Sequence, residues 1–356
     1  MAFFERVKIF YYLSEVAVFL RTSVVIVLAI AFPSIHGFSQ DKLDSAGSTA
    51  SGAESNTSND SDYRSLVDEP SRAYLFRFIR SAAEKENPAT QLEQRSLAVM
   101  GPFRFPDDVT LDRVENKPRA NSIFGIDISH YEGPDFKFDT LRQQGVRFVY
   151  VKATQGVGLK DNMFSKYWAS LDALPPDKSV LRGAYHFLSA GVDGSAQADS
   201  FIKWVEKNGN FKDTDMPPVL DLEWDVPPGG GIDRDRWKGH SADEIMNTAL
   251  AWLRKVEQRT HKAPIVYTSK AFWSDRHIAE SNVNKIAPHY KIWIANYSTS
   301  ARAVEIPSQI NNVKETIWQF SETAKISVGY DKAVDANIFK GTEAEFIASL
   351  QPAPLN

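Results

Sequence analysis

Eight short apolar runs follow one another along the second two-thirds of the chain, each bounded by residues that favour turns. They predict strands over 123–128, 146–153, 181–187, 218–223, 264–268, 291–295, 316–320 and 333–339. Between the early runs, the spacing of apolar residues predicts helices over 139–144, 163–174, 196–207 and 242–260. The pattern is clearest at 242–260. Strands that alternate with helices pair in parallel, and eight such units favour a closed barrel. Because the last three connections are too short or irregular for full helices, we predict an α/β fold with an incomplete TIM-type barrel.

The composition excludes several classes of protein. A chain of 356 residues has room for one large domain and an appendage. Its 41 Lys and Arg stand against 45 Asp and Glu, so no broad cationic surface is expected, which argues against nucleic acid as the main partner. The chain has no cysteine, which excludes disulfides, thiolate metal sites and a cysteine nucleophile.

The first 40 residues (1–40) are typical of a signal peptide or a membrane anchor. An apolar run at 24–32 follows a basic flank, but alone it is shorter than the roughly 20 residues that span a bilayer. Extending it to 16–32 gives enough length for membrane attachment but places Arg21 inside the run, where a charge is costly. Small residues at 37–39 would permit cleavage. We favour a cleaved signal, with an uncleaved anchor and a cytoplasmic hydrophobic arm as alternatives.

The rest of the chain divides by composition. Residues 41–70 are rich in Ser and Asp and predict a disordered linker, because they cannot bury enough apolar surface to fold. Residues 71–120 are expected to form a short helical extension. Its best pattern, at 71–83, predicts a helix docked on the main domain, with membrane-surface contact through its arginines as the alternative. The barrel domain is expected to cover 121–348, with a tail at 349–356.

The segment 216–225 places two carboxylates within an apolar strand. Period-two alternation puts Val219, Asp221 and Glu223 on one face, with the two acidic Cα atoms about 6.6 Å apart. Buried carboxylates must be paired, protonated or used in chemistry. Two neighbouring carboxyl groups with unequal pKa values suit the cleavage of a glycosidic bond. Salt bridges to Lys152 or to an arginine are the structural alternative, and the spacing leaves both open.

Each predicted strand carries or adjoins one short motif. The motifs are Phe-Gly-Ile-Asp-Ile-Ser-His-Tyr-Glu-Gly (124–133), Phe-Val-Tyr-Val-Lys-Ala-Thr-Gln-Gly (148–156), Gly-Ala-Tyr-His-Phe (183–187), Pro-Pro-Val-Leu-Asp-Leu-Glu (217–223), Ile-Val-Tyr-Thr-Ser (265–269), Trp-Ile-Ala-Asn-Tyr (293–297), Trp-Gln-Phe (318–320) and Val-Asp-Ala-Asn-Ile-Phe (334–339). Together they resemble glycoside hydrolase family 25, the Chalaropsis-type lysozymes, and they occur in that family's order. The set is specific, although each motif alone is weak.

This resemblance implies a (β/α)5(β)3 barrel that hydrolyses the β-1,4 bond between N-acetylmuramic acid and N-acetylglucosamine in peptidoglycan. The family's acidic positions match Asp127, Asp221, Glu223 and Asp335. Glu223 would be the general acid. Asp221 would keep the proton affinity of Glu223 high and orient the substrate's N-acetyl group, while Asp127 and Asp335 would position and polarise sugar groups. The sequence leaves open whether an enzyme nucleophile or the acetamido group attacks.

Other polar and aromatic residues at strand ends are candidates for substrate binding, namely Tyr185, His186, Tyr267, Asn296, Tyr297, Trp318, Gln319 and Asn337. The tyrosines can bind sugar hydroxyls or cap the core, and Trp318, like Trp224 and Trp293, can stack on sugars or pack inside. His186 is interpreted as a hydrogen-bonding residue, because no second ligand at metal spacing accompanies it. We expect no metal or cofactor, and we expect Lys152 to pair with a carboxylate.

Two other functions remain open from the sequence. Asp-x-Glu on a barrel strand also suits a chitinase-like glycosidase, and a noncatalytic wall-binding module tethered by its N-terminus is the alternative from another class. The expected partner is peptidoglycan, and the expected state is an exported monomer that is secreted, periplasmic or membrane-anchored facing the cell wall.

The Pro/Gly/Asp-rich loop at 226–240 adjoins Glu223 and is expected to restrict or reshape the cleft.

Overall fold

The structure is a computed structural model, and it describes residues 69–350. The predicted signal or anchor at 1–40 and nearly all of the predicted linker lie outside these residues. No helix among residues 69–350 is long and apolar enough to cross a membrane.

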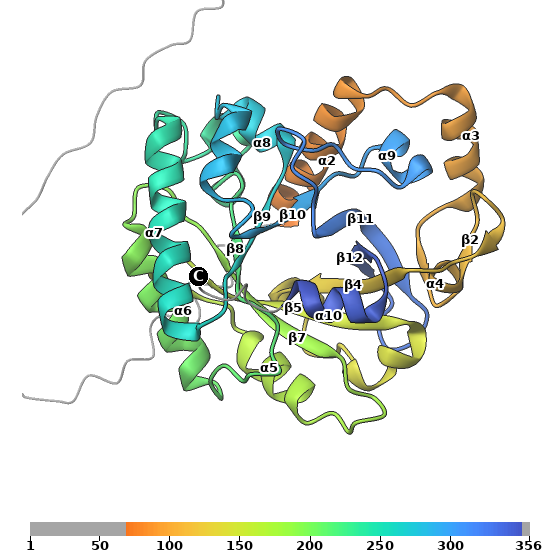
Figure 1. Cartoon of the computed structure of the whole chain (residues 1–356), viewed down its shortest axis with the longest axis horizontal. Coiled ribbons are helices and arrows are strands. Elements are labelled where there is room, and N and C mark those ends of the chain that lie inside the picture. The colour runs from red at the N-terminus through yellow and green to blue at the C-terminus, as the bar shows by residue number, and fades with distance from the viewer. Residues whose placement is uncertain (1–68, 351–356) are drawn as a thin grey trace, which may run out of the picture. The chain divides into compact units, whose positions relative to one another are not determined.

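Eight strands form a closed barrel (Figure 1). They coincide with the eight predicted runs and are β4 (Ser122–Ile128), β5 (Val146–Gln155), β7 (Leu181–Phe187), β8 (Val219–Asp221), β9 (Ile265–Thr268), β10 (Lys291–Ala295), β11 (Ile317–Ile326) and β12 (Ala333–Lys340). Neighbours from β4 to β11 pair in parallel. β12 lies between β11 and β4 and is antiparallel to both. The expected closed α/β barrel is therefore confirmed.

The parallel pairing that is predicted from the alternation of strands with helices does not extend to β12. Only residues 327–332 separate β11 from β12, too few for the crossover that a parallel pair requires, so the chain turns back as a hairpin. This reversal places Asp335, near the start of β12, directly opposite Asp127 on β4. The register thus brings together two acids that are far apart in the sequence.

Helices cover the outside of the barrel between the early strands, at α5 (Phe164–Asp172), α6 (Gly194–Lys207) and α7 (Ala242–Thr260). α7 begins with a Ser241–Glu244 capping box and buries a stripe that includes Ile245 and Leu253. The later connections hold only the short helices α8 (Lys270–Asp275) and α9 (Thr299–Val304) and the 3-10 helix η5 (Glu280–Lys285), and α10 (Glu343–Ser349) follows β12.

The helix predicted at 139–144 is instead a pair of 3-10 turns, η2 (Phe138–Thr140) and η3 (Arg142–Gln144). Gly145, with a φ of 90°, ends this segment in the left-handed region before an α-helical turn can extend. The remaining 3-10 turns are η1 (His130–Glu132) and η4 (Ile232–Arg234), and a short strand β6 (Leu159–Lys160) folds back on β5.

The barrel core is closely packed around two aromatic side chains of β5, Phe148 and Tyr150. A Cβ atom at Gly125 would lie 2.3 Å from the Phe148 ring, and one at Gly183 would lie 2.1 Å from the Tyr150 ring. The Tyr150 hydroxyl donates a hydrogen bond to the carbonyl of Pro217, at 3.0 Å, which fixes the ring. These contacts hold β4, β5 and β7 close together below the carboxyl ends of the strands.

The chain before the barrel packs against it. It forms α2 (Glu69–Glu86), α3 (Gln91–Met100), β1 (Arg104–Phe105), α4 (Asp107–Thr110), β2 (Leu111–Asp112) and β3 (Lys117–Pro118). β1 pairs with β11 outside the barrel. The helix predicted at 71–83 lies within α2, and its residues Ile79 and Ala83 are buried.

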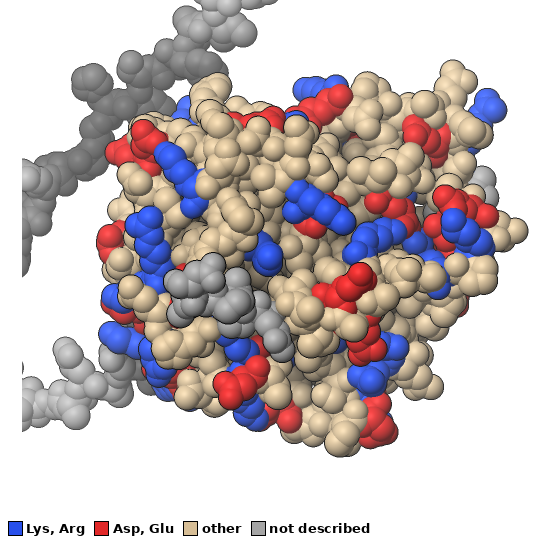
Figure 2. All heavy atoms as spheres, in the orientation of Figure 1, with Lys and Arg blue, Asp and Glu red and all other residues tan. Residues whose placement is uncertain are grey.

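On the face seen in Figure 2, acidic and basic side chains are interspersed, with no broad field of one sign.

Candidate active site

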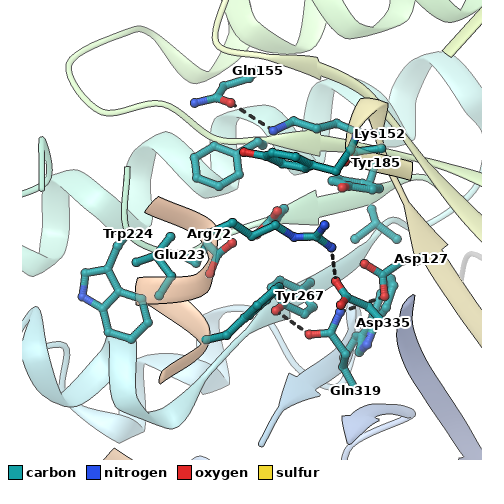
Figure 3. A pocket seen from close by; sticks show the side chains of 18 of the residues that line it. Arg72, Asp127, Lys152, Gln155, Tyr185, Glu223, Trp224, Tyr267, Gln319 and Asp335 are labelled. Carbon is teal, nitrogen blue, oxygen red and sulfur yellow. Dashed lines mark hydrogen bonds and ion pairs between the residues drawn. The ribbon is translucent and has the colours of Figure 1, made fainter. Parts of the chain in front are cut away.

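Four acidic side chains line one pocket at the carboxyl ends of the barrel strands (Figure 3). They are the four predicted acids, and they come from three strand ends and one turn: Asp127 on β4, Asp221 at the end of β8, Glu223 just beyond it and Asp335 on β12. The pocket is also lined by Arg72, Leu75, Phe76, Ser129, Tyr131, Lys152, Gln155, Tyr185, Phe187, Val219, Trp224, Val226, Tyr267, Trp293 and Gln319.

Asp127 is held from behind by two amide groups. Its Oδ2 accepts hydrogen bonds from Asn337 Nδ2 at 2.7 Å and from Gln319 Nε2 at 2.8 Å. Burial, followed by the charge of Asp335, raises the pKa of Asp127, and the two amide donors oppose this. The position of this carboxyl group is therefore fixed before any ligand binds.

Gln319 is itself oriented by two tyrosines. Its Oε1 accepts hydrogen bonds from the hydroxyl groups of Tyr267, at 2.7 Å, and Tyr297. Because both lone pairs of the carbonyl oxygen are engaged, the amide nitrogen must point to Asp127. Tyr267 lines the pocket, whereas Tyr297 lies behind it, 2% exposed.

Asp221 and Glu223 share the pocket without a close counter-ion. Neither has a Lys or Arg partner within 4.0 Å among residues 69–350, and Asp221 Oδ1 has no hydrogen-bond partner there. The described residues therefore do not form the salt bridges that were the alternative interpretation of these two carboxylates. Burial, then the charge of Glu223, raises the pKa of Asp221 well above its usual range.

Glu223 has a pKa suited to proton transfer near neutrality. Burial is the main cause that raises the pKa of Glu223 to about 7; Lys152 and Arg72 oppose the rise, and Asp335 and Asp235 contribute to it. A carboxyl group with this pKa is substantially protonated at pH 7 and can act as a general acid. The same burial raises the pKa of Asp335 to about 6, against the charge of Arg72.

Lys152 lies in the pocket without the expected ion pair. Its Nζ donates to Gln155 Oε1 at 3.0 Å and stands 4.8 Å from the centre of the Phe187 ring. Within the described residues it forms no contact shorter than 4.0 Å with a carboxylate, so the prediction of a direct pair was wrong. Burial lowers the pKa of Lys152, and Asp161, Asp221 and Glu223 oppose this through longer-range attraction.

The backbone that carries Glu223 is braced by the loop at 226–240. Trp237, 1% exposed, donates from Nε1 to the carbonyl oxygen of Glu223 at 3.1 Å. Asp235 Oδ1 accepts from the backbone N–H of Asp225 at 2.8 Å, which ties the far side of the loop to the residues after Glu223. Of the described loop residues, Val226 lines the pocket. The loop therefore supports the backbone of Glu223, and its first residue also forms part of the pocket wall.

The other predicted binding residues divide into two groups. Tyr185, Tyr267 and Gln319 line the pocket, as do Trp224 and Trp293. Those that do not reach it are His186, Asn296, Tyr297, Trp318 and Asn337.

The residues outside the pocket lining make other contacts. His186 is fully buried, 2.7 Å from Thr154 Oγ1, and stacks on Trp252 on the helix-covered side of β7. Trp318 donates to the carbonyl of Asn296, and Asn337 links Trp293 to Asp127. Asn337 and Tyr297 thus support pocket residues from behind.

Sequence reasoning did not place Arg72 in this pocket. Arg72 pairs with Asp335 at 2.6 Å and with Glu132 at 3.2 Å, and its guanidinium lies over the Tyr131 ring at 4.8 Å. The excess of acids at the predicted site indicated that a cation was needed. The sequence near these acids could not identify Arg72 as that cation, because Arg72 and Asp335 are 263 residues apart.

Comparison with known proteins agrees with this geometry. The family model described as "Glycosyl hydrolases family 25" matches residues 126–328. "Uncharacterized protein YegX" of Escherichia coli O6:H1 is 31% identical over 244 residues, 67% of this chain and 78% of that protein. "Lysozyme M1" of Streptomyces globisporus is 29% identical over 248 residues, 68% of this chain and 75% of that protein. The crystal structure of the bacterial lysozyme from Streptomyces coelicolor aligns with a TM-score of 0.54 and 28% identity, covering 64% of this chain and 96% of that one.

Proposed function

Because the chain belongs to glycosyl hydrolase family 25, we propose that it is a muramidase that cleaves the β-1,4 bond between N-acetylmuramic acid and N-acetylglucosamine in peptidoglycan. The observation that carries this proposal is the pair formed by Asp221 and Glu223. Both carboxyl groups face one pocket without a close cation, and the pKa of Glu223 is about 7. The pair thus supplies a protonated acid beside a second carboxyl group, as glycosidic cleavage requires.

In the reaction, Glu223 donates its proton to the glycosidic oxygen while the bond from that oxygen to C1 of N-acetylmuramic acid breaks. Asp221 accepts a hydrogen bond from the acetamido N–H and turns the acetamido oxygen toward C1, where it forms a transient bond. Glu223, now a carboxylate, takes a proton from the water that attacks C1, and the bond between C1 and the acetamido oxygen breaks as the bond to water forms. Asp127 and Asp335 polarise sugar hydroxyls around the developing positive charge.

The test is turnover of purified peptidoglycan by the full chain and by Glu223→Gln. We expect the variant to lose at least about 10²-fold in kcat, because general acid catalysis commonly contributes this much. Glu343→Gln, at an exposed glutamate at the start of α10, is the matched control and should keep full activity. Equal release of muropeptides by Glu223→Gln and the wild type would remove Glu223 from the acid role.

Product analysis separates this function from its alternatives. Borohydride reduction of the products should label new muramic acid ends, and chitin oligomers should be cleaved slowly or not at all. Labelled glucosamine ends or rapid chitin cleavage would support the chitinase-like alternative. Binding to peptidoglycan without any new reducing ends would support the wall-binding alternative.

We also infer the finer architecture and the location of the protein. The family's (β/α)5(β)3 description is supported by the helices α5, α6 and α7 between early strands and by the short hairpin between β11 and β12. Action on cell-wall polymer requires the catalytic domain outside the cytoplasmic membrane, whether residues 16–32 are cleaved or serve as an anchor. A monomeric state is part of the same proposal, and sedimentation of the full chain tests it.

A further inference from the structure

Helix α2 lies on the pocket and supplies part of its lining. Arg72, Leu75 and Phe76 face the pocket, while the other lining residues come from the barrel and its loops. Phe76 meets the Tyr297 ring edge-on at 5.7 Å between centroids, and Phe78 meets the Trp224 ring at 5.1 Å. A segment that precedes the barrel in the sequence therefore closes part of the cleft.

The side chain of Arg72 lies across the pocket between Glu223 and Asp335 (Figure 3). Its Nη2 is 2.6 Å from Asp335 Oδ2, and its Nη1 is 3.2 Å from Glu132 Oε1. Both terminal nitrogens are thus engaged by carboxylates, and Asp335 is engaged by a protein cation. A sugar that contacts Glu223 and Asp335 together must occupy the space that this side chain fills.

On the basis of the function proposed above, we propose that α2 is an autoinhibitory cover, and that Arg72 must leave Asp335 before the glycosidic bond can reach Glu223. A fixed wall of the cleft would leave the acids available to the substrate. Arg72 instead neutralises one acid and holds a second, Glu132, whose other oxygen accepts from the backbone N–H of Ser129 at 2.7 Å. In this state Arg72, Asp335 and Glu132 have partners within the protein and need no substrate to supply them.

Besides Arg72, polar and apolar side chains of α2 join the helix to the rest of the domain. Arg80 pairs with Glu322 at an exposed position, and Glu84 accepts from the backbone N–H of Thr299. In the described part of α2, Ile79 and Ala83 are the buried apolar residues, and the helix is followed by a non-helical break at 87–90. Ile79 belongs to the same hydrophobic core as Phe148 and Tyr150, and Leu75, Phe76 and Phe78 pack against that core, so moving the helix off the pocket must break these apolar contacts as well.

The first test removes the cation. Arg72→Ala in the full chain should raise the initial rate of peptidoglycan turnover by about tenfold, since α2 then no longer forms the ion pair with Asp335. Arg77→Ala is the matched control, because Arg77 is an exposed arginine of the same helix that makes no ion pair within residues 69–350. A lower rate for Arg72→Ala, with Arg77→Ala unchanged, would make Arg72 a substrate-binding residue and overturn the proposal.

The second test fixes the helix in place. The chain has no cysteine, so Arg80→Cys with Glu322→Cys introduces two unique thiols outside the pocket. Joining them with a short reducible cross-linker should lower turnover at least about tenfold, and reduction should restore it. Full activity in the cross-linked protein would show that α2 does not need to move.

The third test needs no catalysis. In Glu223→Gln, soluble peptidoglycan fragments should accelerate backbone hydrogen exchange in residues 72–86 as the helix leaves the pocket. Slower or unchanged exchange in the presence of bound fragments would overturn the cover. Because this readout follows binding alone, it remains decisive even if the wild type proves inactive, which would instead refute the proposed reaction.

Discussion

At the scale of single residues, the charges around Glu223 set the pH range in which it can act. Lys152 is the strongest influence that lowers the pKa of Glu223 against the effect of burial. With the pKa of about 7, activity should fall as the pH rises above 7, because the general acid loses its proton.

Lys152→Met removes this cation from the pocket and should raise the pKa of Glu223 further. The alkaline limb of the kcat profile should then move to higher pH, by about one pH unit. Lys203→Met, at an exposed lysine of α6, is the matched control and should leave the profile in place. An unchanged alkaline limb in Lys152→Met would mean that another group controls it.

The sequence could predict the four acids of the site but only part of their surroundings. Asp127, Asp221, Glu223 and Asp335 stand in apolar strands or just after them, where an acid is costly and therefore informative. Arg72 could not be placed, because its role depends on packing between segments far apart in the chain. Asn337 and Gln319 were noted as strand-end residues, yet their roles as partners of Asp127 needed the barrel register.

At the scale of elements, the close approach of β5 and β7 gives a sharp prediction about stability. A Cβ at Gly183 would lie 2.1 Å from Tyr150 Cε1, and the hydrogen bond from Tyr150 to Pro217 prevents the ring from turning away. Gly183→Ala should therefore lower the free energy of unfolding by about 2 to 3 kcal/mol. Gly158→Ala, where a Cβ meets no atom within 4 Å, should change it by less than about 0.5 kcal/mol.

Urea denaturation of the two glycine variants provides the measurement. Equal midpoints for Gly183→Ala and Gly158→Ala would mean that the barrel relaxes around the extra methyl group.

All eight strands were predictable because each is a short apolar run between turn residues, and in the folded protein these runs do form strands. The 3-10 turns at 138–144 were not, since a segment this short carries too few periods to distinguish 3.0 from 3.6 residues per turn. The direction of β12 depends on the length of its connection rather than on its own residues.

At the scale of the whole molecule, the buried acids make stability depend on pH. The folded-state pKa of Glu223, about 7, lies above the ordinary value of 4.5. The folded form therefore holds the proton more tightly than the unfolded chain, and this stabilisation is present at low pH and lost as the pH rises through about 7. Asp127, Asp221 and Asp335 are shifted in the same direction.

Glu223→Gln should therefore be more stable than the wild type at pH 8, by on the order of 2 kcal/mol, and the difference should shrink toward pH 5. Thermal unfolding of both proteins at the two pH values measures this. The control Glu343→Gln should show no such dependence, and a difference for Glu223→Gln that grows toward pH 5 would contradict the raised pKa.

The insertion of β12 between β11 and β4 has a consequence for biosynthesis. A nascent chain that has left the ribosome only as far as β11 already carries Asp127, Asp221 and Glu223. It still lacks Asp335, and it lacks Asn337, one of the two amides that hold Asp127. The ring of strands stays open until β12 is released, so a partly made chain cannot assemble the complete acid set. The order of translation thus delays the appearance of a hydrolase inside the cell that makes it.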